Sequence, residues 1–165
     1  MLPHGGPCMR PIFSVMAVLW LLTACGPSNI PGTKVPDTQA NREIVDLVET
    51  YRVAVEERDM ETLTQVVSRR YFENASTTAK TTDDYGYEQL LKEVFPVLRD
   101  NVKKVVYKID VERITLTGRE ASVYIDWDLK FQYVEGGLEG WATAKDKNRL
   151  DLVMEDGRWK ILSGL

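Results

Sequence analysis

Two carboxylates and two tyrosines fall within one short segment, Asp83-Asp84-Tyr85-Gly86-Tyr87. A carboxylate in a dry pocket can act as a general base, and a nearby tyrosine hydroxyl can donate a hydrogen bond to a bound molecule. The segment precedes a predicted helix, so Asp84 can equally cap that helix while a tyrosine anchors the loop. Both interpretations stay open, and Asp84, Tyr85 and Tyr87 are candidate ligand-lining residues.

Large aromatic side chains in the C-terminal half form a second candidate lining. They are Tyr107, Trp127, Tyr133 and Trp141. The first three lie in runs that alternate polar and apolar residues, a pattern typical of a strand with one buried face. Rings on such a face either belong to the core or line a pocket for an apolar ligand. The pattern does not separate these two roles.

Asp126 and Asp128 flank Trp127 and are a tempting catalytic pair. Residues two apart on a strand share one face, and this pair lies opposite the apolar side chains. We therefore expect both carboxylates to point to solvent.

Histidine and cysteine are nearly absent. The chain has one histidine, His4, and two cysteines, Cys8 and Cys25, all of which precede the predicted domain. A domain without these residues excludes histidine dyads, Ser-His triads, histidine metal sites and a cysteine nucleophile. No phosphate-binding glycine loop or calcium loop is evident either. We predict no catalytic residue, metal ligand or cofactor, which leaves single-carboxylate chemistry as the remaining enzymatic route.

Composition narrows the class of protein further. The chain has 165 residues, of which 44% are hydrophobic and 28% charged, with a formal net charge of -4. This length suits one domain with its own core. A negative net charge argues against nucleic acid as the main partner, because a phosphate backbone requires a basic face.

The N-terminus has the pattern of an export signal. The run from Ile12 to Leu22 is apolar except for Ser14, and it follows Arg10. It is shorter than the roughly 20 apolar residues that span a bilayer, which favours a secretory signal over a membrane helix.

The segment Leu22-Thr23-Ala24-Cys25 resembles the lipobox of bacterial lipoproteins. The resemblance implies cleavage after residue 24, acyl chains on Cys25 and anchorage to a membrane of the cell envelope. Gly26 stands where an Asp would resemble an inner-membrane retention signal. The outer membrane, facing the periplasm or the surface, is therefore favoured if the source is Gram-negative. Residues 25–40, rich in Gly, Pro and Ser, are predicted to be a flexible tether.

Helices are predicted first in the domain that spans residues 41–165. Apolar residues at helical spacing predict a helix over 41–58 with Asn41 as its N-cap, followed by a second helix capped by Asp59. A polar loop is expected over 74–84. A third helix is expected over 87–98, bent or shortened by Pro96.

Strands follow the helices. Alternating apolar residues predict strands over 102–117 and 123–133. Turn signals at Gly136-Gly137 and at the predicted hairpin turn Asp156-Gly157 delimit two further strands over 138–155 and 158–162. The polar residues Asp146-Lys147-Asn148-Arg149 predict a bulge or bend in the third strand. Long antiparallel strands with one buried face twist, so a curved sheet wrapped around the helices is expected, an α+β fold.

The helical opening IVDLVETYRVAVEERDMETLTQVVS and the ending LDLVMEDGRWKILS resemble nuclear-transport-factor-2-like proteins. This superfamily includes ketosteroid isomerases and polyketide cyclases. The resemblance covers residues 41–165 and implies a cone-shaped α+β domain, with N-terminal helices packed on a strongly curved antiparallel sheet. It implies no single activity, because the superfamily hosts enzymes, ligand binders and interaction modules.

Three functions are consistent with these residues. The first is a membrane-anchored, non-catalytic lipoprotein whose cone binds a small apolar ligand. The second is a module of the cell envelope that dimerises through the outer face of its sheet. The third is a carboxylate-dependent isomerase, dehydratase or cyclase.

Overall fold

The computed structural model describes residues 28–74 and 84–165, apart from the side chain of Glu135. The predicted signal segment and Cys25 lie outside the described residues, as does most of the predicted loop 74–84. Within the two described ranges, no helix is long and apolar enough to cross a membrane.

The segment before the first helix is folded against the domain. Asn29 and Pro36 form an isolated antiparallel bridge, and Val35 is buried with 1% of its surface exposed. Residues 29–36 of the predicted tether therefore lie folded against the domain.

Helix α1 (Gln39–Glu57) also begins earlier than predicted. Thr38, not Asn41, is the N-cap, and its hydroxyl accepts a hydrogen bond from the Asn41 backbone N–H at 3.2 Å. The Asn41 side chain is buried and donates from Nδ2 to the Pro36 carbonyl at 2.8 Å. The asparagine fixes the preceding turn in place, a role that helical spacing does not reveal.

The turn from α1 into α2 (Met60–Val66) follows the prediction. Arg58 adopts a left-handed conformation that ends α1. Asp59 then caps α2 by accepting from the backbone N–H groups of Glu61 and Thr62, which confirms its predicted role.

The predicted third helix is divided into three parts. They are α3 (Tyr87–Gln89), a π-helical turn η1 (Leu90–Val94) and α4 (Phe95–Asn101). Pro96 lies in the first turn of α4, where its missing N–H costs least. A proline ring would clash with the carbonyl four residues earlier in a regular helix, and the wider π-turn directly before it relieves that clash.

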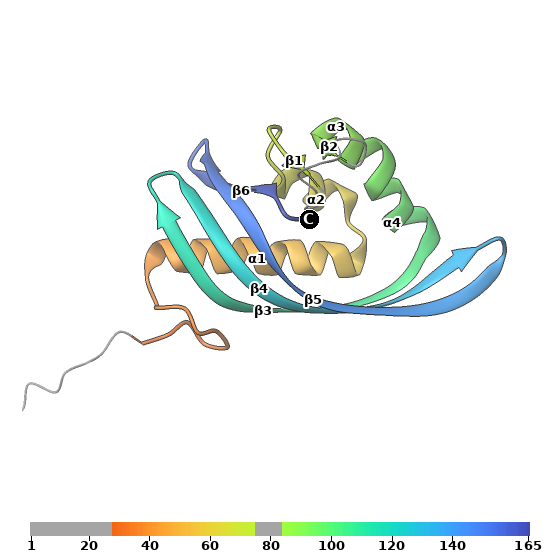
Figure 1. Ribbon diagram of the computed structural model, residues 1–165, viewed down its shortest axis with the longest axis horizontal. Helices are drawn as coiled ribbons and strands as arrows, with labels where there is room; N and C mark the ends of the chain where they lie inside the picture. The colour runs from red at the N-terminus through yellow and green to blue at the C-terminus, as the bar shows by residue number, and fades with distance from the viewer. Residues whose placement is uncertain (1–27, 75–83) are drawn as a thin grey trace, which may run out of the picture.

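A four-stranded antiparallel meander follows, with the order β3-β4-β5-β6. Its strands are β3 (Val102–Thr117), β4 (Glu120–Glu135), β5 (Leu138–Glu155) and β6 (Arg158–Ser163), and a separate small hairpin joins β1 (Phe72–Glu73) to β2 (Tyr85–Gly86). The sheet is strongly curved, with the helices on its concave side (Figure 1). The predicted α+β fold is confirmed.

Strand register differs from prediction at one point. Asp146-Lys147-Asn148-Arg149 pairs regularly with β4, with no bulge. The register shifts lie in β3, between Val102 and Lys104 and between Val111 and Arg113, and in β5 between Asp151 and Leu152, where it pairs with β6. The polar side chains of residues 146–149 therefore reflect an exposed strand without a bulge.

Helix α1 also covers the outer edge of β3. Glu56 accepts from the Tyr107 backbone N–H at 2.7 Å, and Arg52 donates to the Tyr107 carbonyl at 3.1 Å. The two side chains pair with each other at 2.6 Å. They satisfy backbone groups that a further strand would otherwise satisfy, which protects this edge from unwanted pairing.

Candidate ligand-binding site

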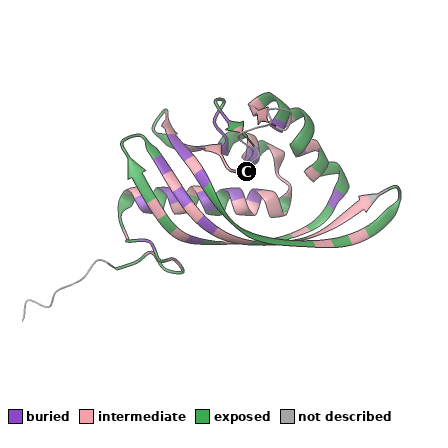
Figure 2. Cartoon of the chain, in the orientation of Figure 1, coloured by how far each residue is buried: buried purple, intermediate pink, exposed green. Residues whose placement is uncertain are grey.

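The concave face of the sheet changes character along its length. Near α1, Val123 and Ile125 of β4 are buried, at 0% and 2% exposure. Towards the β4–β5 turn the same face continues with Trp127, Leu129 and Phe131, which are only partly buried. Figure 2 shows buried residues gathered where the strands pass α1, and exposed ones towards the turn.

Small residues of β5 widen this half of the face. Ala144 pairs with Leu129, Ala142 with Phe131 and Gly140 with Tyr133. A Cβ atom on Gly140 would lie 2.6 Å from the Tyr133 ring, so the tyrosine lies flat over the glycine. We call the partly covered surface of Trp127, Leu129, Phe131, Ala142 and Ala144 the apolar floor.

Four tyrosines meet deeper in the concavity, one each from α1, β2 and β3 and one from the loop between α2 and β1. We call Tyr51, Tyr71, Tyr85 and Tyr107 the tyrosine cluster. The Tyr51 and Tyr107 rings pack edge to face at 6.0 Å and share a hydrogen bond, and Tyr71 lies 6.1 Å from Tyr85. Trp127 joins the cluster to the apolar floor, because its ring lies 6.3 Å from that of Tyr107.

The end of the chain covers the tyrosine cluster. The Leu165 N–H donates to the Tyr71 hydroxyl at 3.3 Å, and the Tyr85 hydroxyl donates to the Leu165 carbonyl at 3.4 Å. Figure 1 shows the C-terminus on the concave side of the sheet, below β1 and β2 and to the left of α4. Residue 165 and the two tyrosines thus form one contact at the mouth of the cone.

Gly164 makes this arrangement possible. Its N–H donates to Glu73 at 2.7 Å, and its carbonyl accepts from Asn148 Nδ2 at 2.8 Å. Its φ is +94°, and a Cβ would lie 2.2 Å from the Arg149 carbonyl oxygen. Only glycine fits this close approach.

Burial raises the pKa of three tyrosine hydroxyls in the cluster. The pKa values of Tyr51, Tyr71 and Tyr107 all lie above the ordinary value, chiefly because the ionised form would lose its solvation. These hydroxyls remain neutral donors and acceptors at any physiological pH.

An alkaline titration is expected to show this protection. Each raised pKa stabilises the folded state below the unfolded-state value of about 10, and this contribution is lost as pH rises above it. Absorbance of tyrosinate near 295 nm should therefore show a class of tyrosines that ionises only together with loss of the far-ultraviolet dichroism signal. Full ionisation near pH 10 in a folded chain would contradict the burial of the cluster.

One carboxylate oxygen of Asp84, Oδ1, has an unusual environment. The residue is partly exposed, yet its Oδ1 is buried and has no hydrogen-bond partner among the described residues. An unpaired buried acceptor is costly, and a ligand or water that donates to it would remove the cost. Among the sequence-predicted lining residues, Asp84 is the one for which the described part of the chain leaves a buried polar atom unpaired.

The other predicted lining residues separate into two groups. Tyr85, Tyr107 and Trp127 lie in the concavity, and Tyr133 lies at its far end, 6.2 Å from Phe131. Tyr87 lines a separate hollow of about 290 Å³ together with Arg69.

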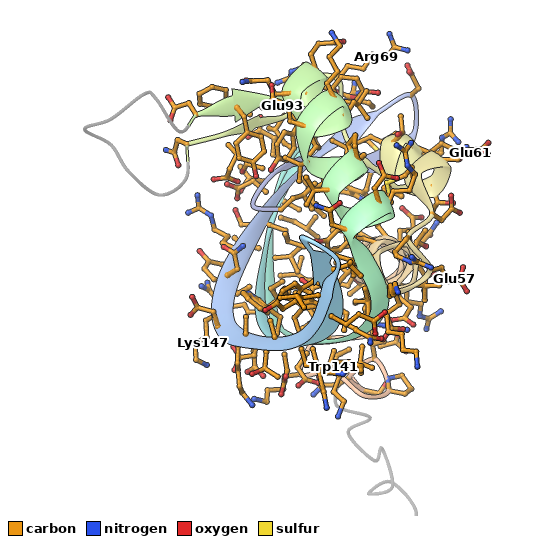
Figure 3. All side chains as sticks on the ribbon, turned by 90° about the vertical axis from the view of Figure 1, so that its right-hand side faces the viewer. Glu57, Glu61, Arg69, Glu93, Trp141 and Lys147 are labelled. Atoms are coloured by element: carbon orange, nitrogen blue, oxygen red, sulfur yellow. The ribbon has the colours of Figure 1, made fainter. Side chains whose placement is uncertain are left out.

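Trp141 lies on the opposite, convex face. It pairs with Gln132, it is 52% exposed, and Lys130 Nζ lies 5.0 Å from its ring. In Figure 3 it points away from the helices, at the foot of the β4–β5 hairpin. Trp141 therefore lies outside the concave site.

The convex face carries the two aspartates that flank Trp127. Asp126 pairs with Lys147 at 2.6 Å and Asp128 with Lys145 at 3.6 Å. Both carboxylates are held in surface ion pairs, as expected from their position on the strand. Within the part of the chain that the structure describes, no three His, Cys, Asp or Glu side chains come together as a metal site.

Sequence reasoning did not select Tyr51, Tyr71 or Phe131 as site residues. Tyr51 has the spacing of a core residue on α1, and Tyr71 follows α2 as an apparent anchor. Only the closure of the sheet around the helices brings them together, so their spacing carried no signal.

Comparison with solved structures shows the fold. A nuclear-transport-factor-2-like protein from Salmonella enterica superposes with a TM-score of 0.59 at 15% identity, covering 74% of this chain and 86% of that one. A Novosphingobium aromaticivorans protein provisionally assigned as a scytalone dehydratase gives 0.62 at 13% identity, covering 76% and 80%. A hexachlorocyclohexane dehydrochlorinase gives 0.60 at 15% identity, covering 76% and 82%.

At these identities the likeness establishes a nuclear-transport-factor-2-like fold and nothing finer. The sequence matches no protein-family model and no curated protein.

Proposed function

We propose that this protein is a lipoprotein of the cell envelope whose nuclear-transport-factor-2-like domain binds a small apolar molecule. The apolar floor carries the proposal. Trp127, Leu129 and Phe131 lie on the side of the sheet that normally forms a core, yet each remains partly exposed. A continuous apolar surface of this kind is stabilised when a ligand covers it.

The residues around the floor indicate what such a ligand should look like. Trp127 and Phe131 offer ring faces and edges, which suit an aromatic or hydrocarbon body. The neutral hydroxyls of the tyrosine cluster, which Trp127 joins to the floor, can hold one or two polar atoms. We therefore infer a mainly apolar ligand with a hydroxyl or similar group at one end.

Native mass spectrometry of the full chain, purified in mild detergent, tests this proposal. We expect a bound small molecule that dissociates on denaturation, or, after delipidation, saturable binding of the apolar dye 1-anilinonaphthalene-8-sulfonate. A chain that carries no adduct and binds no dye would contradict ligand binding. The same chain denatured in guanidinium is the control for adsorbed lipid.

Catalysis by a single carboxylate is a second candidate, and the unpaired Asp84 oxygen is what favours it. Two proteins of similar fold are named as a scytalone dehydratase, provisionally assigned, and a hexachlorocyclohexane dehydrochlorinase. Recovery of a bound ligand in chemically altered form would favour this alternative over simple binding.

A further inference from the structure

Strand β5 has a long edge without a neighbour. β6 pairs with β5 only from Asp151 to Glu155. From residue 138 to residue 150, β5 has β4 on one side and none of the described strands on the other. Figure 1 shows this part of β5 running beside β4 to the turn at the far end of the hairpin.

Side chains close one part of this edge. Asp146 Oδ1 accepts from the Lys147 backbone N–H, and Asn148 Oδ1 accepts from the Arg149 backbone N–H, both at 2.8 Å. The N–H groups of residues 147 and 149 therefore point away from β4. Because backbone direction alternates along a strand, residues 139, 141, 143 and 145 present their N–H and C=O groups at the same edge.

We propose that residues 139–145 of β5 pair antiparallel with the same residues of a second copy of this chain. The two-fold axis passes between the two Ala142 residues. The unpaired backbone groups end at Lys145, because the Asp146 side chain already bonds to the next outward-facing N–H, that of Lys147. The result is one sheet that continues across the two copies, and Ala142 and Ala144 of the apolar floor lie along the seam between them.

Charge complementarity selects this register. Glu139 faces Lys145 of the second copy, twice by symmetry, and Trp141 faces Thr143. Glu139 and Lys145 lie on the surface, with side-chain exposures of 50% and 77%, and within one copy they already pair with Lys103 and Asp128, respectively. Opposite charges across an antiparallel pair are favourable, whereas a register centred on Lys145 would oppose two lysines.

Size complementarity on the concave face agrees with this register. There Ala142 faces Ala142, and Gly140 faces Ala144 of the second copy. These side chains are small enough for the two sheets to meet without a clash. Lysines on an edge normally discourage pairing, but here each finds a glutamate.

A charge-swap series measured by sedimentation equilibrium of the full chain in detergent tests the charge register. Glu139→Lys and Lys145→Glu should each raise the dimer dissociation constant by about tenfold or more, since each turns two attractive pairs into repulsive ones. The double variant should return to within about threefold of the parent. Lys147→Glu, beyond residues 139–145, is the matched control and should leave the constant unchanged. A monomeric parent chain, or a double variant that is not rescued, would overturn the proposal.

Disulfide trapping tests the axis independently. In this register residue 142 forms a non-hydrogen-bonded pair, whose Cα atoms lie about 4.5 Å apart, within disulfide range. Ala142→Cys should cross-link when an oxidant such as diamide takes two electrons and two protons from the paired thiols. Ala144→Cys is the control for position, because residue 144 faces Gly140 of the second copy and its thiol has no partner thiol there. The unsubstituted chain measures the background of cross-linking through Cys8 and Cys25. Equal cross-linking at positions 142 and 144 would reject the axis.

Discussion

Cys25→Ser is expected to move the protein almost completely from the membrane fraction to the soluble fraction. Serine lacks the thiol that would carry the acyl chains, and every buried methylene contributes about 0.8 kcal/mol to membrane binding. Loss of two or more chains therefore removes the whole anchor. Ultracentrifugation of lysed cells, followed by immunoblotting of both fractions, measures the effect, and labelled palmitate reports acylation directly.

Cys8→Ser is the matched control, because Cys8 lies upstream of the predicted cleavage point and should not affect partitioning. Retention of the Cys25→Ser chain in the membrane with unchanged label would contradict the lipoprotein proposal. Such a result would leave the ligand proposal standing, since the two rest on different parts of the chain.

Trp127→Ala is expected to weaken binding of an apolar ligand by about 70-fold. If a ligand covers about half of the indole, roughly 100 Å² at about 25 cal/mol per Å², the loss is about 2.5 kcal/mol. Trp141→Ala removes the same type of side chain from a neighbouring strand, but on the convex face. It should change affinity by less than about twofold. Fluorescence titration with 1-anilinonaphthalene-8-sulfonate compares the two variants.

Stability must be separated from binding in this comparison. Trp127 also packs on Tyr107, so its removal is expected to lower the melting temperature. Trp127→Phe keeps a ring in place and should recover most of the affinity. Equal loss of binding in Trp127→Ala and Trp141→Ala would place the ligand elsewhere.

The fold was accessible from sequence because each element has its own local signal. Alternation marked β3 and β4, the Asp156-Gly157 turn marked the hairpin of β5 and β6, and Asp59 marked the start of α2. The start of α1 was missed because the Asn41 side chain bonds to the Pro36 carbonyl, a contact outside the helix. Spacing within a helix cannot report such a partner.

The site was less accessible, for two physical reasons. Alternation identifies which face of a strand is apolar, but not how far the rest of the protein covers that face. Ile125 and Trp127 therefore look equivalent in sequence, although Ile125 is buried and Trp127 is only partly buried. In the first half of β5 the residues on the concave face are glycine and alanine, which give no signal of a site. The sequence therefore favoured the large Trp141 as a lining residue, although strand pairing places it on the convex face. The tyrosine cluster depends on contacts between four separate segments of the chain.

The early start of the folded domain sets how freely the protein can move if Cys25 is acylated. Only three peptide units separate Cys25 from Ser28, a span of about 10 Å when fully extended. Residues 28–38 cannot add reach, because the buried Val35 and the Asn29–Pro36 bridge hold them to the domain. The domain would then lie directly on the lipid headgroups with restricted tilt, and exchange of an apolar molecule with the bilayer would need no transit through bulk water.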